Sequence, residues 1–283
     1  MSRPERVFRF LGPRASCLFK DRRLWLSSVV DFNDIFEVAP RYDLLIQAQI
    51  DHLTKREFAF QHELDWYEWK VAMRPINEQL ARESTSLLPE RLQAEFGEHF
   101  GILCFTEKLS NLLMWGHYTA NHEGFVVEFD TSHNLFAPEN FQAVTYSEVR
   151  PVVDTNVPWS ILLTKSPEWD YEKEHRLVLP LHMAKSGRRS EKDLKDRGFV
   201  DLPIESVRAV YYGSRIKEKT FHQLTSALAV SDCSHIQRFM MERASSTFTL
   251  KSVPLAEWKP PSEEARTDFE QLLVASLERW PKR

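Results

Sequence analysis

Residues 101–130, GILCFTEKLSNLLMWGHYTANHEGFVVEFD, decide the fold because a strand, a helix and a second strand follow one another there. The apolar run ILCF is typical of a short strand, and the run FVVEF alternates well enough for another. Between them, Ser110 or Asn111 can cap a helix by accepting a bond from an N–H of its first turn. Asn121 to Gly124 supplies residues that end a helix in left-handed backbone. The stretch therefore predicts a strand–helix–strand unit.

The helix in this unit carries aromatic and titratable side chains within little more than one turn, namely Trp115, His117 and Tyr118. Residues three or four apart share a helix face, so His117 lies near Leu113 and Met114. A helix that only covered a sheet would not need this concentration, which indicates a site with His117 as a catalytic candidate. The alternative is a core His and Tyr with satisfied hydrogen bonds, since such residues are ordinary in protein interiors.

Length and composition describe an ordinary globular protein of 283 residues, 42% hydrophobic and 28% charged. The net charge of -4 and the pI near 6.2 give no overall field for nucleic acid, so such a contact needs a local patch. Only 8 glycines are present, and neither a P-loop nor a G-x-G-x-x-G motif occurs. These features argue against P-loop and dinucleotide-fold classes.

The cysteines are three and widely spaced, Cys17, Cys104 and Cys233. This number and spacing suit a reducing compartment and match neither a disulfide framework nor a zinc knuckle. The chain has no apolar signal segment and no run of membrane-spanning length. We therefore expect a cytoplasmic protein without a membrane partner.

The N-terminal region contains two short strands, at 6–10 and 24–27, and then the polar pair Asn33-Asp34 framed by Phe32 and Phe36. Asn and Asp commonly form Asx-turns or cap helices, which is one interpretation of the pair. The other is that buried phenyl rings hold Asn33 and Asp34 over a pocket.

A second dense stretch, SPEWDYEKEHRLVLP at 166–180, alternates as an extended segment that enters a strand. Glu172, Glu174 and Arg176 would then share one face. Such a group can be a ladder of ion pairs on the surface, which contributes little stability. It can also be a site in which Arg176 orients one carboxylate and the other bonds a hydroxyl or supports positive charge.

The rest of the chain completes the fold prediction. Residues 41–95 have helical spacing and form a helical insert, 185–198 is a solvated loop, and 260–283 is a C-terminal helix. We predict a single α+β domain over 1–283, with a mixed or mainly antiparallel sheet of six or more strands, a central short helix and the inserted helical segment. The predicted strands lie near residues 24, 102, 125, 142, 177, 207 and 235.

Five blocks of this sequence, in order, resemble family 2971 of the domains of unknown function. They are LWLSSVVDFNDIFE, CFTEKLSNLLMWGHYTANHEGFVVEFD, a Val-x-Tyr strand, K-x-x-x-W-x-Y-E-x-E-H-R from Lys165 to Arg176, and a V-x-x-V-x-x-G strand end. The resemblance covers about residues 6 to 250. Two departures are the Phe8-Arg9 pair, where the family has Tyr-Arg, and Ile35, where it has Pro. The resemblance implies a bacterial cytoplasmic protein of the kind found near defence or mobile-element genes.

An Arg on a first strand, a Ser on the next and a Glu-x-Glu before a late strand are also similar to the pattern of ADP-ribosyltransferases. That resemblance implies that Arg9 holds a pyrophosphate of NAD and that Ser27 or Ser28 supports the wall of the site. It also implies that Glu174 bonds the nicotinamide ribose and favours its oxocarbenium-like state, while Glu172 activates the acceptor.

The expected cofactor is NAD, consumed as a substrate, and no metal is expected. The acceptor would be a protein or a nucleic acid, or the protein would bind another small-molecule ligand. We predict that the two dense stretches line one cleft, with Arg9 and the Asn33-Asp34 loop at its rim. The remaining expected ligand contacts are Trp115, Tyr118 and Arg176.

Two other classes of function remain open. A metal-dependent nuclease would use acids such as Glu128, Asp130, Glu172 and Glu174 to hold a divalent cation. A non-catalytic sensor or partner-binding module of a defence system would use the aromatic cluster as a ligand pocket and the helical insert as its protein interface. A transferase requires Arg9, a Ser and Glu174 around one cleft, whereas a nuclease requires three acids within metal distance.

Overall fold

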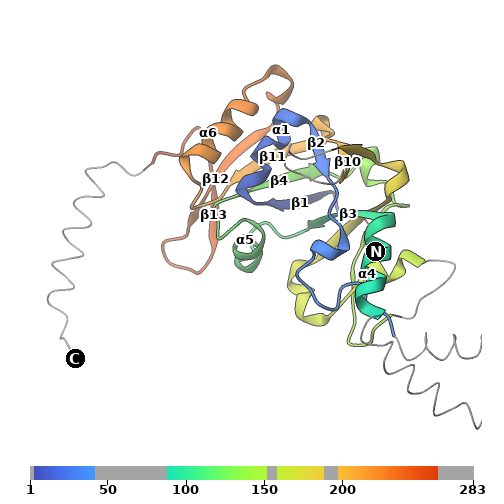
Figure 1. Cartoon of the computed structure of the whole chain (residues 1–283). Helices are drawn as coiled ribbons and strands as arrows, with labels where there is room; N and C mark the ends of the chain where they lie inside the picture. Colours follow the sequence, from blue (N-terminus) through green and yellow to red (C-terminus); the bar gives the residue numbers. More distant parts are fainter. Residues whose placement is uncertain (1–2, 42–87, 152–157, 188–196, 261–283) are drawn as a thin grey trace, which may run out of the picture.

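The computed structural model describes residues 3–41, 88–151, 158–187 and 197–260 (Figure 1). Most of the predicted helical insert at 41–95, and nearly all of the predicted helix at 260–283, lie outside the described residues. The described end of the insert is helical and belongs to α4 (Leu88–His99). The functional site is therefore built from the sheet and the short segments around it.

An eight-stranded sheet organises the described chain, and it confirms the predicted α+β class with a mainly antiparallel sheet. All neighbouring strands pair antiparallel except β11 and β12, which are parallel. In spatial order the strands are β13 (Leu250–Pro254), β12 (Gln237–Arg243), β11 (Val207–Tyr212), β4 (Phe125–Asp130), β1 (Arg6–Leu11), β3 (Phe100–Thr106), β8 (Glu174–Pro180) and β5 (Phe141–Ala143).

Two small sheets extend this framework. One contains β2 (Arg23–Trp25), β10 (Arg197–Asp201) and β9 (Lys185–Gly187), and the other pairs β6 (Thr145–Tyr146) with β7 (Thr164–Lys165). The expected loop at 185–198 was therefore wrong at its two ends, where the chain pairs as strands. The strand expected at 141–146 is divided into β5 and β6.

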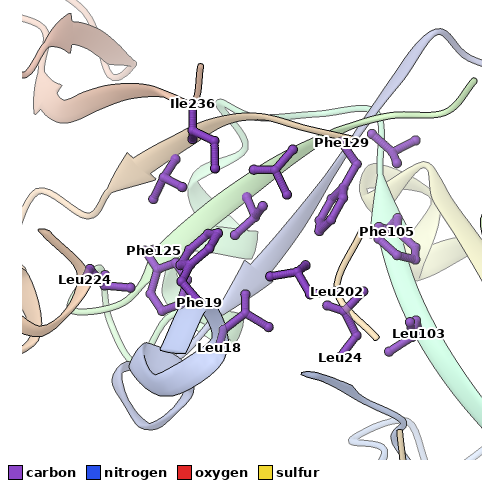
Figure 2. Close-up of a cluster of buried hydrophobic side chains, with 14 of the residues drawn as sticks. Leu18, Phe19, Leu24, Leu103, Phe105, Phe125, Phe129, Leu202, Leu224 and Ile236 are labelled. Atoms are coloured by element: carbon purple, nitrogen blue, oxygen red, sulfur yellow. The ribbon is translucent and has the colours of Figure 1, made fainter. Parts of the chain in front are cut away.

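The hydrophobic core lies on the face of the sheet covered by α1 (Leu18–Asp21) and α6 (Glu218–Ala227). Figure 2 shows Phe19 of α1, Leu224 of α6 and Phe125 of β4 in this cluster. Alternate residues of the strands point to the opposite face, where Phe8 and Val126 pack with Trp115 of α5 (Leu112–Tyr118). Burial of an apolar side chain of this kind contributes roughly 2 to 3 kcal/mol, so the core holds the strands that carry the site.

The predicted strand–helix–strand unit is confirmed as β3, α5 and β4. The side chain of Asn111 caps α5 by accepting hydrogen bonds from the N–H groups of Leu113 and Met114. After α5 the backbone is left-handed at residues 120–122. The turn then passes so close to β1 that a Cβ on Gly124 would lie 2.0 Å from the carbonyl oxygen of Leu11. Only glycine fits there, and α5 is held against the sheet.

Candidate functional site

A cavity of about 360 Å³ opens between α5, the strands β1, β3 and β8, and the loop that follows β2. It brings together residues from every region that the sequence indicated as a site. Its lining consists of Phe8, Arg9, Phe10, Ser27, Asp31, Phe32, Asn33, Glu37, Cys104, Phe105, Met114, His117, Tyr118, Lys165, Glu172, Glu174 and Arg176. Eight of the eleven predicted site residues are among them.

Glu174 and Arg176 form the centre of the cavity floor on β8. They point the same way because they are two residues apart on a strand. The guanidinium of Arg176 donates Nε to Oε1 of Glu174 at 2.9 Å and Nη2 to Oε2 at 3.0 Å. Burial alone would raise the pKa of Glu174, but the charges of Arg176 and Lys165 lower it to about 2. Glu174 is therefore an anion throughout the physiological pH range.

Lys165 of β7 joins the two acids of the Glu-x-Glu motif. Its Nζ donates to Oε2 of Glu172 at 2.7 Å and to Oε2 of Glu174 at 3.3 Å, and it lies 4.4 Å from the ring centre of Trp169. Burial lowers the pKa of Lys165, but the carboxylates of Glu174 and Glu172 outweigh this and raise it. Lys165 is thus a fixed cation between two anions.

Glu172 reaches the cavity from a 3₁₀ turn, η5 (Pro167–Glu172), and not from the strand. Lys173 is left-handed, with φ of 44°, and β8 begins only at Glu174. The expectation that Glu172, Glu174 and Arg176 share one strand face was therefore wrong for Glu172. Pro167 begins the turn with a φ that suits it. The turn still delivers Glu172, whose Oε1 accepts a 2.5 Å hydrogen bond from the hydroxyl of Tyr118.

Tyr118 connects α5 to the charged residues of the cavity. Its hydroxyl donates to Glu172, and Asn33 lines the same cavity. Burial, together with the negative charge of Glu172, raises the pKa of Tyr118. The phenol is therefore neutral and remains a hydrogen-bond donor. His117, its neighbour on α5, lines the mouth of the cavity and is exposed.

Arg9 of β1 stands on the opposite wall, half-buried. Its Nη1 donates to the carbonyl oxygen of Cys104 at 3.1 Å, and its guanidinium lies 5.7 Å from the ring centre of Phe105. Phe8, Phe10 and Phe105 make this wall largely apolar. The cavity thus has a polar, charged floor and an aromatic wall, which is the usual composition of a small-molecule site.

Glu37 is the second partner of Arg176. Its Oε1 accepts from Nη1 of Arg176, which also donates to the carbonyl oxygen of Leu162 at 2.6 Å. Oε2 of Glu37 is buried without a hydrogen-bond partner among the described residues. Burial raises the pKa of Glu37 above its ordinary 4.5, although Arg176 opposes the change. Oε2 is the oxygen without a partner, so a proton taken up by Glu37 would reside there.

The variant Glu37→Gln tests this assignment through the pH dependence of stability. The pKa in the folded state lies above the unfolded value, so the folded protein binds more protons and wild-type stability falls as pH rises from 4.5 through the raised pKa. Gln cannot ionise, and we expect the decline to become shallower and the free energy of unfolding at pH 8 to stay within about 1 kcal/mol of wild type or exceed it. Urea unfolding from pH 4.5 to 8.5 measures both.

The control for Glu37→Gln is Glu139→Gln, which changes an exposed acid and is expected to leave the pH profile unaltered. A variant Glu37→Gln with the wild-type slope would show that Glu37 is ionised in the folded protein.

Three predicted ligand residues lie outside the cavity. Trp115 is fully buried, its indole N–H donates to the carbonyl oxygen of Leu109 at 2.7 Å, and its ring packs against Phe10. Ser28 lines a neighbouring hollow. Trp115 packs from α5 against Phe8 and Val126 of the sheet, and for that reason it is a core residue and not a ligand contact.

Asp34 is the third. Its Oδ1 accepts from the N–H of Phe36 at 2.9 Å, so the Asx-turn interpretation of this pair is confirmed. Asp34 faces a groove of about 710 Å³ that adjoins the cavity and shares Asn33 and Lys165 with it. The expected frame of buried phenyl rings was wrong, because Phe36 is 48% exposed.

Sequence reasoning assigned no role to Glu37, Cys104 or Lys165. All three residues lie in the sequence blocks that resemble the family of unknown function. Glu37 ends the block LWLSSVVDFNDIFE, Cys104 begins the block CFTEKLSNLLMWGHYTANHEGFVVEFD, and Lys165 begins the K-x-x-x-W block. The Trp169 ring of that block packs on Lys165, and this contact explains their spacing.

The acids proposed for a nuclease do not gather at one place. Glu128 accepts from the hydroxyl of Tyr211 at 2.6 Å and pairs with Arg6, and Asp130 pairs with Arg208, whereas Glu172 and Glu174 lie in the cavity. Within the described residues, no group of three or more His, Cys, Asp or Glu side chains could hold a metal ion. No observation favours the nuclease alternative.

The segment from α5 to β8 also matches a family model. Residues 114–177 match the family "Protein of unknown function (DUF2971)". The resemblance expected from the sequence is confirmed over this span. No curated protein and no solved structure matches the chain, so the comparisons give no support for the expected similarity to ADP-ribosyltransferases.

The DUF2971 span begins in α5 and ends in β8, so it contains most of the charged cavity floor. Tyr118, Lys165, Glu172, Glu174 and Arg176 all lie inside it. Arg9 and Glu37 lie outside and come from the N-terminal segment. In the part of the chain that the structure describes, none of the helices has both the length and the apolar character needed to cross a membrane.

Proposed function

We propose that the protein is an NAD-dependent ADP-ribosyltransferase whose reacting ribose binds in the cavity on β8. The observation that carries this proposal is the convergence of Arg9, Ser27, Tyr118, Glu172 and Glu174 around one cavity from four segments of the chain. A site that served only stability would hold apolar residues here, because buried ion pairs contribute little stability compared with apolar residues of the same size.

The chemistry follows from the charge on the floor. The bond between C1′ of the ribose and the nicotinamide nitrogen breaks, and its electron pair stays with nicotinamide. The ribose becomes an oxocarbenium-like cation, which the anion Glu174 stabilises because its pKa is about 2. An O–H or N–H nucleophile of the acceptor forms the new bond to C1′ and passes its proton to Glu172.

Hydrogen-bonding capacity assigns different roles to the two acids. Glu174 accepts two bonds from Arg176 and one from Lys165, which occupy three of the four lone pairs of its carboxylate. Glu172 accepts one bond at each oxygen, from Tyr118 and Lys165, so a lone pair remains on each. Glu174 therefore acts through its charge, and Glu172 has the capacity to take a proton.

The size of the cavity suits one end of a dinucleotide. Its volume of about 360 Å³ is at the lower end for ligand pockets, and the adjoining groove offers about 710 Å³ more. The nicotinamide riboside half fits the cavity, with the ring against Phe8, Phe10 and Phe105. A guanidinium has five N–H donors, so Arg9 can bind a phosphate and still donate to Cys104.

The variant Tyr118→Phe tests the proposal without changing a charge. Removing the hydroxyl leaves Oε1 of Glu172 without its donor, and we expect NAD consumption to fall roughly 10- to 100-fold with the fold retained. The assay follows release of nicotinamide from NAD by chromatography, with circular dichroism and thermal unfolding as checks of the fold.

Tyr211→Phe is the matched control, because the hydroxyl of Tyr211 donates to another buried carboxylate, Glu128, at 2.6 Å but lies away from the cavity. It is expected to keep wild-type turnover. Equal turnover of the two variants would overturn the role of Tyr118. A wild-type protein that binds NAD by calorimetry but releases no nicotinamide with any offered acceptor would support the binding-module alternative.

A further inference from the structure

A second hollow, of about 740 Å³, is lined mainly by the loop between β12 and β13 and includes Leu112 of α5. Figure 1 shows this loop beside α5. The hollow belongs to neither the cavity nor the groove beside it. Its lining consists of Leu112, His122, Ser214, Arg215, Arg243, Ala244, Ser245, Ser246, Thr247, Phe248, Thr249 and Leu250.

The charge of this hollow is positive. Arg215 and Arg243 line it, and none of the described residues that line it is Asp or Glu. Among the described residues, neither guanidinium has a hydrogen bond or ion pair. Two acids next to lining residues are paired: Glu123, beside His122, pairs with Lys217, and Glu242, beside Arg243, pairs with Lys251. A local field of this kind attracts anions although the whole chain carries a net charge of -4.

The remaining lining provides hydroxyls and one aromatic ring. Ser214, Ser245, Ser246, Thr247 and Thr249 supply hydroxyl groups around the two arginines. The backbone N–H of Ala244 donates to the carbonyl of Thr249 at 2.9 Å and closes the loop, so these groups are held together.

Phe248, at the tip of the loop, is 99% exposed. A phenyl ring in this position packs against nothing in the described structure and presents both faces to a ligand. Guanidinium and hydroxyl groups are the usual partners of phosphate oxygens, and an exposed aromatic ring is the usual partner of an unpaired base.

We propose that this hollow binds single-stranded nucleic acid, with Arg215 and Arg243 on backbone phosphates and Phe248 stacked on a base. Single strands are favoured over duplex because one projecting ring needs an unstacked base. An acidic peptide would satisfy the arginines and leave Phe248 and the hydroxyls without a role.

The hollow and the cavity are joined by α5. Leu112 lines the hollow and His117 the mouth of the cavity, five residues apart or about 8 Å along the helix axis. A nucleic-acid strand bound in the hollow therefore passes near the reacting ribose, and we infer that this strand is the acceptor of the ADP-ribosyl group. This last step rests on the proposed ADP-ribosyl transfer, whereas the binding does not.

Fluorescence anisotropy with a fluorescein-labelled oligothymidylate of about 12 nucleotides, without NAD, tests the binding. The double variant Arg215→Gln/Arg243→Gln is expected to bind at least 10-fold more weakly at 50 mM salt, and its salt slope should fall by about 1.4 because two phosphate contacts are lost. Phe248→Ala should weaken binding roughly 5- to 50-fold without changing the slope.

Arg14→Gln is the matched control, since Arg14 is exposed but outside the hollow. Wild-type affinity in the double variant, or no binding by the wild type, would overturn the proposal. So would competition by free thymidine monophosphate as strong as by the oligonucleotide, which would indicate a mononucleotide pocket.

A second arm adds NAD labelled in its adenylate part and looks for transfer of label to the oligonucleotide. Label that depends on Arg215 and Arg243 supports the acceptor role. Binding without label, in a protein that does release nicotinamide, would overturn the acceptor role and leave both the nucleic-acid site and the proposed NAD chemistry standing.

Discussion

Replacing Glu174 with Gln is expected to lower NAD consumption by about 1,000-fold. The amide keeps the size of the side chain but removes the negative charge that stabilises the oxocarbenium-like ribose at the cavity floor. The measurement is nicotinamide release under saturating NAD, compared with Glu128→Gln. Glu128 is equally buried and bonds a tyrosine hydroxyl, yet it lies outside the cavity, so its variant should keep wild-type turnover.

The same substitution also lowers the free energy of unfolding at neutral pH. The pKa of Glu174 is about 2 in the folded protein against an ordinary 4.5, a difference that corresponds to roughly 3 kcal/mol. A lowered carboxyl pKa stabilises the fold above pH 4.5, and this contribution is lost as pH falls toward 2. The Glu174→Gln variant lacks this contribution at every pH. The nicotinamide-release assay is therefore run well below the unfolding temperature of the variant.

The stability cost makes the outcomes separable. A folded Glu174→Gln protein that consumes NAD at the wild-type rate would contradict the proposed role of this carboxylate. If the variant does not fold, the comparison of Tyr118→Phe with Tyr211→Phe still tests the cavity, because those substitutions remove only a hydroxyl.

The parts of the fold that the sequence predicted are those determined by short-range signals. The β3–α5–β4 unit depends on an apolar run, the cap at Asn111 and a left-handed turn, all within thirty residues. Glu174 and Arg176 were placed together because side chains alternate along a strand. Such rules need no knowledge of distant segments.

The parts that it missed depend on contacts between distant segments. Glu37 meets Arg176 across 139 positions, and nothing local distinguishes it from a surface acid. Trp115 was expected in the site because it lies beside His117, but the face of α5 that packs on the sheet was determined by Phe10 and Val126 from other strands. Glu172 was assigned to the strand because the alternating sequence pattern of β8 extends back over residues that form a 3₁₀ turn in the structure.

Replacing Arg176 with Met is expected to lower the free energy of unfolding by about 3 to 5 kcal/mol, the usual effect of removing one partner from a buried ion pair. Arg176 is 1% exposed, and its loss leaves Glu174 with Lys165 alone and the carbonyl of Leu162 without a donor. Urea unfolding at pH 7 measures the loss. Arg208→Met is the control, because Arg208 donates Nε and Nη2 to Asp130 at the surface and should lose less than about 1 kcal/mol.

A double-mutant cycle then separates structure from catalysis. Because the penalty in Arg176→Met arises from unpaired carboxylates, adding Glu174→Gln should restore part of the stability, roughly 1 to 3 kcal/mol. It should restore no turnover, since the anion that stabilises the ribose cation is absent. If the losses of unfolding free energy in the two single variants add up in the double variant, Arg176 and Glu174 have no interaction energy with each other. Recovery of both stability and turnover in the double variant would mean that the pair holds the fold alone and that the reacting ribose is bound elsewhere.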